Sequence, residues 1–442
     1  MSSNNLLGPS LEEILSVIKP LRDDWVTRFK IIDELRHVVE SMESLRGATV
    51  EPYGSFVSNL FSRSGDLDIS IELPNGSYIS SAGKKRKLNL LGEVLIALRQ
   101  KGGWRRMKFI SNARVPILKF ESINYRISCD LSVDNLPCQM KSKFLFWISE
   151  IDNRFRDMVL LVKEWAKAHD INNSKAGTFN SYSLSLLVIF HFQTCVPAIL
   201  PPLRDIYPGN VVDDLIGVRA NAERDIAERC VSNIARFRSD KFRPVNRSSL
   251  CELFVSFLAK FSDIRLRGSE LGICTFTGKW EEIRSNMRWL PKTYAIFIED
   301  PFEQPENTAR SVSARQLTKI SEAFETTRRW LISPNKNQNS ILAAIVGPQI
   351  PHFQMRTPVI SLSIARRAPV TYPSYSSGRN FPPQAERASH SAAQVDRNPQ
   401  NMRREFRSRN LTTQNHETHD PDPQDHSQSQ QTWRPKSVRQ TA

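Results

Sequence analysis

The chain has 442 residues, with 61 Lys and Arg against 46 Asp and Glu, which gives a formal net charge of +15. This length suggests two or three domains, and 40% hydrophobic residues supply their cores. The positive charge favours a polyanionic partner without separating RNA, DNA and acidic lipid surfaces. Six cysteines without a C-x-x-C pair argue against a disulfide scaffold and against a zinc ribbon.

Two helices are predicted over residues 1–46. Apolar residues recur at helical spacing from Leu11 to Ile18, and a second apolar stripe follows from Trp25 to Leu45. Acidic residues near the N-terminus stand where a secretory signal carries basic ones. The most apolar stretch, residues 184–200, is too short and too polar to cross a membrane. We therefore expect an intracellular protein with no membrane partner.

Residues 47–140 predict a small mixed α/β unit. Its strands are expected at residues 48–52, 66–73, 107–110, 116–121 and 125–131, with a helix over 84–101. In the second strand apolar and polar side chains alternate, so the two sets face opposite sides of the sheet. The apolar set is Leu67, Ile69, Ile71 and Leu73, and the polar set is Asp66, Asp68, Ser70 and Glu72.

Strand signals stop after residue 141. Helices are predicted over residues 144–151, 154–169, 181–194, 213–237, 248–262 and 313–331. Residues 333–442 show no sustained periodicity apart from a short apolar piece at 341–346. Because this segment lacks the apolar content to offset its ordering entropy, we predict a disordered basic tail.

The strongest chemical signal is the pair Gly54-Ser55, followed ten residues later by Asp66 and Asp68. The two carboxylates project to one face of a strand, where like charges repel and a divalent cation relieves the repulsion. Asp130, on a later strand, would complete the oxygen ligands. A Gly-Ser pair that opens a helix offers N–H groups and a hydroxyl to phosphate. This set suits attack of a 3′-hydroxyl on a nucleotide α-phosphate, with Mg²⁺ or Mn²⁺ as cofactor.

Each of these features is weak alone. A D-x-D pair on a strand is most often a solvated face, and glycosyltransferases also use it. The Gly-Ser pair, the spacing, the two aspartates and the later strand aspartate together are much more specific.

The segment Tyr53-Gly-Ser-Phe-Val-Ser-Asn-Leu-Phe, with Gly65-Asp-Leu-Asp-Ile-Ser, resembles the nucleotidyltransferase motif of the DNA polymerase β superfamily. The form is that of non-ordinary poly(A) polymerases and terminal uridylyltransferases, and the resemblance covers residues 1–332. Residues 1–332 as a whole are especially similar to plant enzymes that tail small RNAs lacking a 3′ methyl group. It implies template-independent transfer of UMP from UTP to RNA 3′ ends, which promotes RNA decay.

The resemblance also implies the domains. A palm-like mixed-sheet nucleotidyltransferase domain is expected at residues 47–140, and a mainly helical poly(A) polymerase-associated domain at 141–332. The helices of residues 1–46 are expected to pack on the helical domain, and the disordered tail occupies 333–442.

Four residues are assigned to nucleotide binding by the resemblance. Lys163 and Lys167 share one helix face and are assigned to the triphosphate, although spacing alone favours a solvated pair. Ser181 is assigned to phosphate, with an N-cap as the alternative. Tyr182 is assigned to stacking on the base, with a core position as the alternative.

Asp300 and Glu303 are assigned to the base edge opposite the tyrosine. A carboxylate suits the N3–H of uracil and equally the amino group of adenine or cytosine. Glu306 stands where several uridylyltransferases carry a His that rejects adenine. Lys141-Ser142 stand where the family often has an Asn-Thr pair that contacts the ribose. Asn135 lies nearer to Asp130 in the sequence and is another candidate for that contact. The alternatives are therefore an ATP-using poly(A) polymerase and, although all three aspartates are present, a catalytically inactive RNA-binding scaffold.

A basic cluster around Trp104 predicts an RNA-binding surface with an aromatic ring for stacking. Its members are Lys84, Lys85, Arg86, Lys87, Arg105, Arg106 and Lys108. The alternative is a solvated helix face whose KKRK run serves nuclear import. We expect RNA 3′ ends as substrates and localisation in cytoplasm and nucleus, and the resemblance implies an Argonaute complex as a partner.

Overall fold

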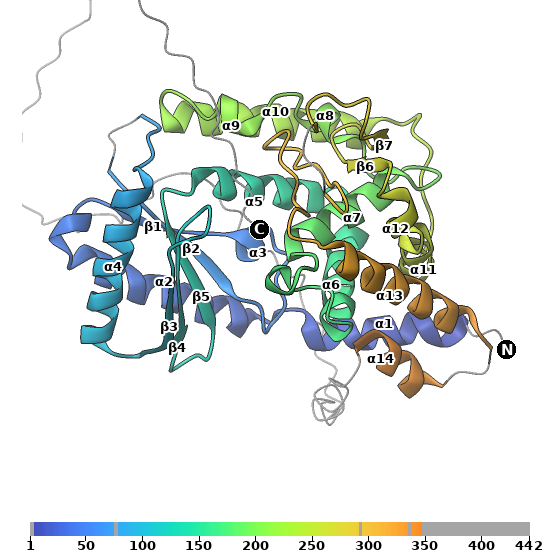
Figure 1. Ribbon diagram of the computed structural model, residues 1–442, viewed down its shortest axis with the longest axis horizontal. Helices are drawn as coiled ribbons and strands as arrows, with labels where there is room; N and C mark the ends of the chain where they lie inside the picture. The colour runs from blue at the N-terminus through green and yellow to red at the C-terminus, as the bar shows by residue number, and fades with distance from the viewer. Residues whose placement is uncertain (1–3, 75–77, 291–293, 335–336, 347–442) are drawn as a thin grey trace, which may run out of the picture. The chain divides into compact units, whose positions relative to one another are not determined.

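The computed structural model describes residues 4–74, 78–290, 294–334 and 337–346. All of these residues belong to the first of two compact units, Met1–Leu362. Within this unit a sheet with its covering helices lies beside a larger group of helices (Figure 1). Among the residues described, no helix combines the length and the apolar character needed to cross a bilayer.

The sheet has five strands: β1 Thr49–Tyr53, β2 Leu67–Glu72, β3 Trp104–Ile110, β4 Ile117–Ser122 and β5 Ser128–Val133. They lie in the order β1-β2-β5-β4-β3, with β2 and β5 parallel and the other pairs antiparallel. This mixed sheet confirms the predicted fold class, and each strand lies within a few residues of its expected bounds.

Alternation along β2 separates the core from the functional face. Leu67, Ile69 and Ile71 are buried in one core with α2 (Arg22–Glu40) and α4 (Lys84–Lys101). On the opposite face Ser70 Oγ donates to Glu72 Oε1 at 2.5 Å. The side-chain amide of Gln139, on α5 (Leu136–Ser149), donates to the same oxygen at 2.6 Å. Both faces of β2 are therefore covered, which fixes the strand that carries Asp68.

The second core is formed by helices. Its main members are α1 (Asn4–Ile18), α6 (Asn153–Ala168), α7 (Ser181–Gln193), α11 (Leu250–Phe261) and α13 (Ala314–Ile332). Shorter or more peripheral helices are α3 Gly54–Val57, α8 Leu203–Ile206, α9 Val211–Asp214, α10 Arg219–Ser239 and α12 Ile264–Arg267, with 3-10 turns at Glu43–Leu45 and Ser174–Ala176.

The two N-terminal helices pack on different cores. We predicted that residues 1–46 pack on the helical domain, and α1 does so through Leu11 and Ile14. Helix α2 instead buries Ile31 and Leu35 in the sheet core. The reason is that the apolar stripe of α2 faces β1 and α4, so the prediction is wrong for α2.

A hairpin in the helical region was not predicted. Strands β6 (Leu271–Cys274) and β7 (Lys279–Glu282) pair antiparallel, so strands do not stop at residue 141 as expected. Each has only four residues, too few for a clear alternation. Ile273 N donates to Phe297 O at 2.8 Å, and Glu299 N donates to Ile273 O at 3.0 Å. The hairpin thereby fixes the segment that leads to Asp300.

The prediction that disorder starts at residue 333 is wrong for α14 (Gln338–Val346), which is a helix. Ile341, Leu342, Ile345 and Val346 are buried in the helical core. The His169 ring N–H, at the end of α6, donates from Nε2 to the Ala344 carbonyl at 2.9 Å. The rest of the predicted disordered tail lies outside the described residues.

Replacing Ile345 with alanine is expected to lower the unfolding free energy by about 2–4 kcal/mol, because its side chain is 0% exposed. Ile332→Ala is the matched control, since Ile332 is 55% exposed at the end of α13. Urea unfolding monitored by tryptophan fluorescence gives both values. Equal losses in the two variants would contradict the docking of α14.

Candidate active site

Two neighbouring strands carry the predicted aspartates at one end of the sheet. Asp66 directly precedes β2, Asp68 lies in β2, and Asp130 lies in β5. The parallel register pairs Asp68 with Asp130, so both project from adjacent strands toward the same face of the sheet.

Burial and mutual repulsion disfavour charge on these carboxyl groups. Burial, then Asp130 and then Asp66 raise the pKa of Asp68 to about 7. Burial and then Asp130 also raise the pKa of Asp66. Three oxygen donors with excess negative charge are a set that a hard divalent cation stabilises. In its chemistry the site fits Mg²⁺ or Mn²⁺.

Lys119, on β4, partly compensates this charge and was missed by sequence reasoning. The antiparallel register pairs it with Asp130, and its Nζ lies 2.6 Å from Oδ1 and 2.5 Å from Oδ2. In the described part of the chain, no three Asp, Glu, His or Cys side chains are gathered closely enough to surround an ion. To hold an ion jointly, the three aspartates would have to lie closer together than they do here, and Asp130 would have to release Lys119.

Gly54 is in direct contact with Asp68. Its φ of +68° lies in the left-handed region, and a Cβ built on it would lie 2.0 Å from Asp68 Oδ2. The Gly54 N–H donates to Ser142 Oγ at 2.7 Å. The prediction that this N–H is offered to phosphate is therefore wrong for this structure. Ser55 follows, half-buried, in the short helix α3.

Arg28, on α2, positions the loop before Asp66 and was also missed. Its side chain is fully buried, and Nη2 donates to the carbonyls of Arg63 and Gly65 at 3.2 and 2.6 Å. The guanidinium carbon lies 4.5 Å from the centre of the Phe61 ring. A basic residue in an amphipathic helix gives no sign in the sequence that it is buried.

The lysine pair of α6 faces the aspartates. Lys163 Nζ donates to the Leu60 carbonyl at 3.0 Å. Burial, and then Lys167, lower the pKa of Lys163 to about 8, while Asp68 opposes that shift. Lys167 Nζ lies 3.4 Å from Glu164 Oε2. Its charge also opposes the upward shift of the Asp66 pKa. The pair therefore lies beside the carboxylates, where a triphosphate would need positive charge.

Asn180 is the N-cap of helix α7. The alternative interpretation of Ser181 as the N-cap is therefore wrong. Asn180 Oδ1 accepts from the Ser183 N–H at 2.7 Å, because Asn180 has the extended backbone of an N-cap. Ser181 is exposed at the first helical position, with its hydroxyl 3.2 Å from Asn172 Nδ2. Its hydroxyl therefore stays accessible to a phosphate.

Tyr182 and the predicted base-edge carboxylates are linked through Lys141. The Tyr182 hydroxyl donates to Asp300 Oδ1 at 3.0 Å. Lys141 Nζ donates to Asp300 Oδ2 at 2.5 Å and to Glu303 Oε2 at 2.7 Å. Burial opposes ionisation of Glu303, but Lys141 and Arg114 outweigh it and keep its pKa low. Lys141 is thus engaged with two carboxylates.

The other candidates for a ribose contact are engaged in the fold. Ser142 Oγ donates to Cys138 O at 2.6 Å. Asn135 is buried, and its side-chain amide donates from Nδ2 to Ser132 Oγ at 3.4 Å.

The basic cluster, which lies on α4 and β3, is only partly available to RNA. Lys84, Lys85, Arg86 and Lys108 are exposed. Lys87 Nζ instead donates to the Asp134 carbonyl at 3.0 Å, and Arg105 and Arg106 both pair with Glu121. Trp104 is buried edge-on against Phe120, so the predicted stacking aromatic is wrong. Its position at the start of a strand does not reveal which face it occupies.

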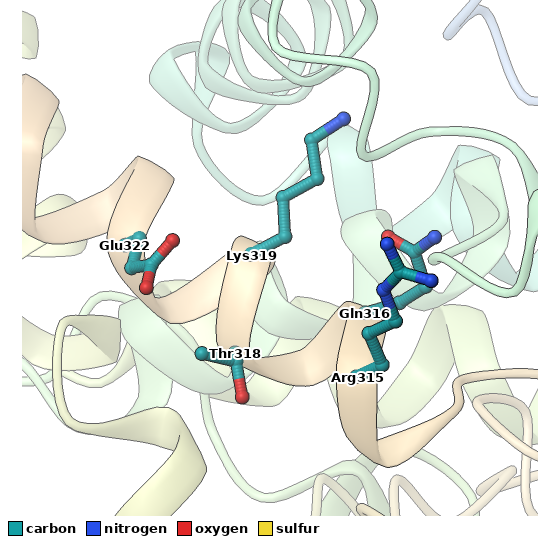
Figure 2. Close-up of a pocket in the computed structure, with 5 residues that line it drawn as sticks. All are labelled: Arg315, Gln316, Thr318, Lys319 and Glu322. Atoms are coloured by element: carbon teal, nitrogen blue, oxygen red, sulfur yellow. The ribbon is translucent and has the colours of Figure 1, made fainter.

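Two surface hollows lie beside α13. The first is lined by that helix alone, and Figure 2 shows Arg315, Gln316 and Lys319 among its residues. It includes none of the predicted site residues, so we do not place the nucleotide there. The second hollow lies between α13 and the end of α6, and Gln316, Lys319, Lys167 and Asn172 are among the residues that line it. It extends the basic surface around Lys167 with residues distant in the sequence.

A protein-family model described as "Poly(A) RNA polymerase, mitochondrial-like, central palm domain" matches residues 7–149. Protein HESO1 of Arabidopsis thaliana is 62% identical over 357 residues, covering 81% of this chain and 70% of HESO1. Poly(A) RNA polymerase GLD2 of Mus musculus is 30% identical over 297 residues, covering 65% of this chain and 57% of GLD2.

Solved structures share the fold. The Cid1 poly(U) polymerase is similar with a TM-score of 0.60 and 22% identity, covering 77% of this chain and 98% of Cid1. The structure of mtPAP in complex with UTP has a TM-score of 0.60 and 21% identity, covering 78% of this chain and 72% of mtPAP. Both relationships confirm a palm-like sheet domain joined to a helical domain.

Proposed function

This chain belongs to the family of non-ordinary poly(A) polymerases and terminal uridylyltransferases, and we propose from this that it adds UMP from UTP to RNA 3′ ends without a template. The observation that carries the chemistry is the parallel register that sets Asp68 beside Asp130, with Gly54 against Asp68.

The proposed roles follow from the charges around the sheet. Asp66, Asp68 and Asp130 would hold Mg²⁺ or Mn²⁺, which when bound neutralises phosphate charge and favours ionisation of the 3′-hydroxyl. Lys163 and Lys167 would bind the triphosphate beside them, together with Ser55 and Ser181. Tyr182 would stack on the base.

We extend the proposal to unmethylated small RNAs, such as miRNA and siRNA, on the strength of overall similarity. RNA cleavage fragments with a free 3′-hydroxyl present the same acceptor. The exposed lysines of α4 would attract the RNA backbone, and an Argonaute complex would deliver the substrate. We propose cytoplasm and nucleus as the compartments.

ATP is the second candidate substrate. Relatives such as GLD2 are named poly(A) RNA polymerases, and Glu306 replaces the His expected of several uridylyltransferases.

One labelled RNA incubated separately with UTP, ATP, CTP and GTP tests the proposal. We expect UTP to be used at least about 10-fold more efficiently than ATP, the effect of one well-placed base contact. The same RNA with a terminal 2′-O-methyl group is expected to be a poorer acceptor. Preferred use of ATP would refute uridylyl transfer and support the second candidate.

A further inference from the structure

Glu303 is held between two cations from different parts of the fold. Arg114, in the loop between β3 and β4, donates from Nη2 to Glu303 Oε1 at 2.6 Å and to Oε2 at 2.8 Å. Lys141, on α5, donates to the same Oε2 at 2.7 Å. The carboxylate is therefore surrounded by protein donors, and both cations lie at one oxygen atom.

Asp300 is likewise occupied by protein donors. Its Oδ1 accepts from the Tyr182 hydroxyl at 3.0 Å and from the Phe302 N–H at 3.0 Å. Its Oδ2 accepts from Lys141. Asp300 thus fixes Tyr182 and Lys141, and neither carboxylate predicted to read the base presents an unoccupied acceptor face.

Arg114 keeps donors for a ligand. Its side chain is 49% exposed, and its Nη1 lies 3.5 Å from Glu306, which Arg310 also contacts at 3.3 Å. Nη2 is thus engaged with Glu303 and Nη1 with Glu306, while among the described residues no acceptor bonds to the Nε–H. Two carboxylates therefore orient a guanidinium that keeps its Nε–H for a ligand.

Lys141 lies near the aromatic ring expected to carry the base, and Arg114 shares a carboxylate oxygen with Lys141. Lys141 Nζ is 5.8 Å from the centre of the Tyr182 ring, and it shares Glu303 Oε2 with Arg114. A base stacked on Tyr182 would therefore meet N–H donors at its edge. Uracil presents the O4 acceptor there, whereas adenine and cytosine present an amino donor.

We propose that Arg114 is a specificity-determining residue that donates a hydrogen bond to O4 of uracil in the incoming UTP. Glu306 then has a positioning role, because it orients the guanidinium from the sequence position where a His was expected. The inference rests on the proposed function, since it concerns the base of the same nucleotide. An amino group facing the guanidinium would leave two donors opposed, which penalises ATP and CTP.

The test is the ratio of kcat/KM for UTP to that for ATP in the full-length wild type and Arg114→Met. We expect the ratio to fall at least about 10-fold, mainly through a higher KM for UTP. Because the ratio is measured within one preparation, a misfolded fraction cancels from it. With 4-thio-UTP, whose sulfur accepts hydrogen bonds weakly, the wild type should lose efficiency relative to UTP and Arg114→Met should not.

Arg46→Met is the matched control, because Arg46 pairs with Glu43 at 3.2 Å on the exposed surface. The control should keep the wild-type ratio of kcat/KM for UTP to that for ATP. Arg114→Lys should give a ratio between those of Arg114→Met and the wild type. A wild type that prefers UTP, with an unchanged ratio in Arg114→Met, would overturn this inference alone. A wild type that prefers ATP would overturn the proposed function and this inference with it.

Discussion

Asp68→Asn is expected to abolish nucleotidyl transfer and, without divalent ions, to raise the melting temperature at pH 8. Asn has no negative charge, so the proposed site loses the ligand that faces both Asp66 and Asp130. We expect product formation from RNA and UTP to fall by at least about 10³-fold, as when a group that stabilises transition-state charge is removed.

The gain in stability follows from the pKa of Asp68, which is raised from its ordinary 3.8 to about 7. As pH rises through this window, the unfolded chain releases its proton first, so the wild type loses unfolding free energy. Asparagine avoids that loss. After allowance for water around this half-buried side chain, the variant should gain about 1–3 kcal/mol above pH 7 and nothing below pH 4.

Thermal unfolding in EDTA at pH 4 and pH 8 measures this difference. Asp225→Asn, an exposed substitution on α10, is the control and should change neither the melting temperature nor its dependence on pH. Adding Mg²⁺ or Mn²⁺ should stabilise the wild type more than Asp68→Asn. Robust transfer by a pure preparation of the variant would refute the proposed mechanism.

Gly54→Ala is expected to reduce transfer by about 100-fold, because displacing a catalytic group by about 1 Å has that effect. The added Cβ would lie 2.0 Å from Asp68 Oδ2 and 2.8 Å from its Cγ, so the carboxylate must move. The positive φ adds backbone strain, and together we expect about 1–3 kcal/mol of destabilisation.

Gly83→Ala is the matched control for that substitution. Gly83 has a φ of −59°, and nothing lies within 4 Å of a Cβ built on it. Steady-state transfer and thermal unfolding of both variants separate the steric effect from a general effect of losing glycine. Wild-type activity in Gly54→Ala would show that Asp68 can move without consequence.

The local pattern was sufficient to predict where the aspartates lie. Alternation along residues 66–73 indicated the face of Asp66 and Asp68, and the same rule indicated that of Asp130. By contrast, Lys119 contacts Asp130 through strand pairing, and Arg114 contacts Glu303 across elements distant in the sequence. A single sequence carries no signal for such pairs, because they depend on tertiary packing and not on local periodicity.

Lengths of elements explain the other differences. Strands β6 and β7 have four residues each, and helix α14 has nine. None of these three segments is long enough for its apolar residues to repeat at a recognisable spacing. The direction of α2 could not be read either, since an amphipathic stripe shows that a helix is buried and not which core receives it.

Helix α1 is synthesised first, but its neighbours lie far along the chain. It packs beside α6, α11 and α14, and Gln338 Nε2 donates to Glu13 Oε2 at 2.6 Å. During translation the sheet and α2 have their partners close in the chain, whereas α1 can complete its contacts only after α14 has left the ribosome. Such long-range closure is slow, so a nascent chain would hold a nearly complete sheet while its first helix remains unassembled.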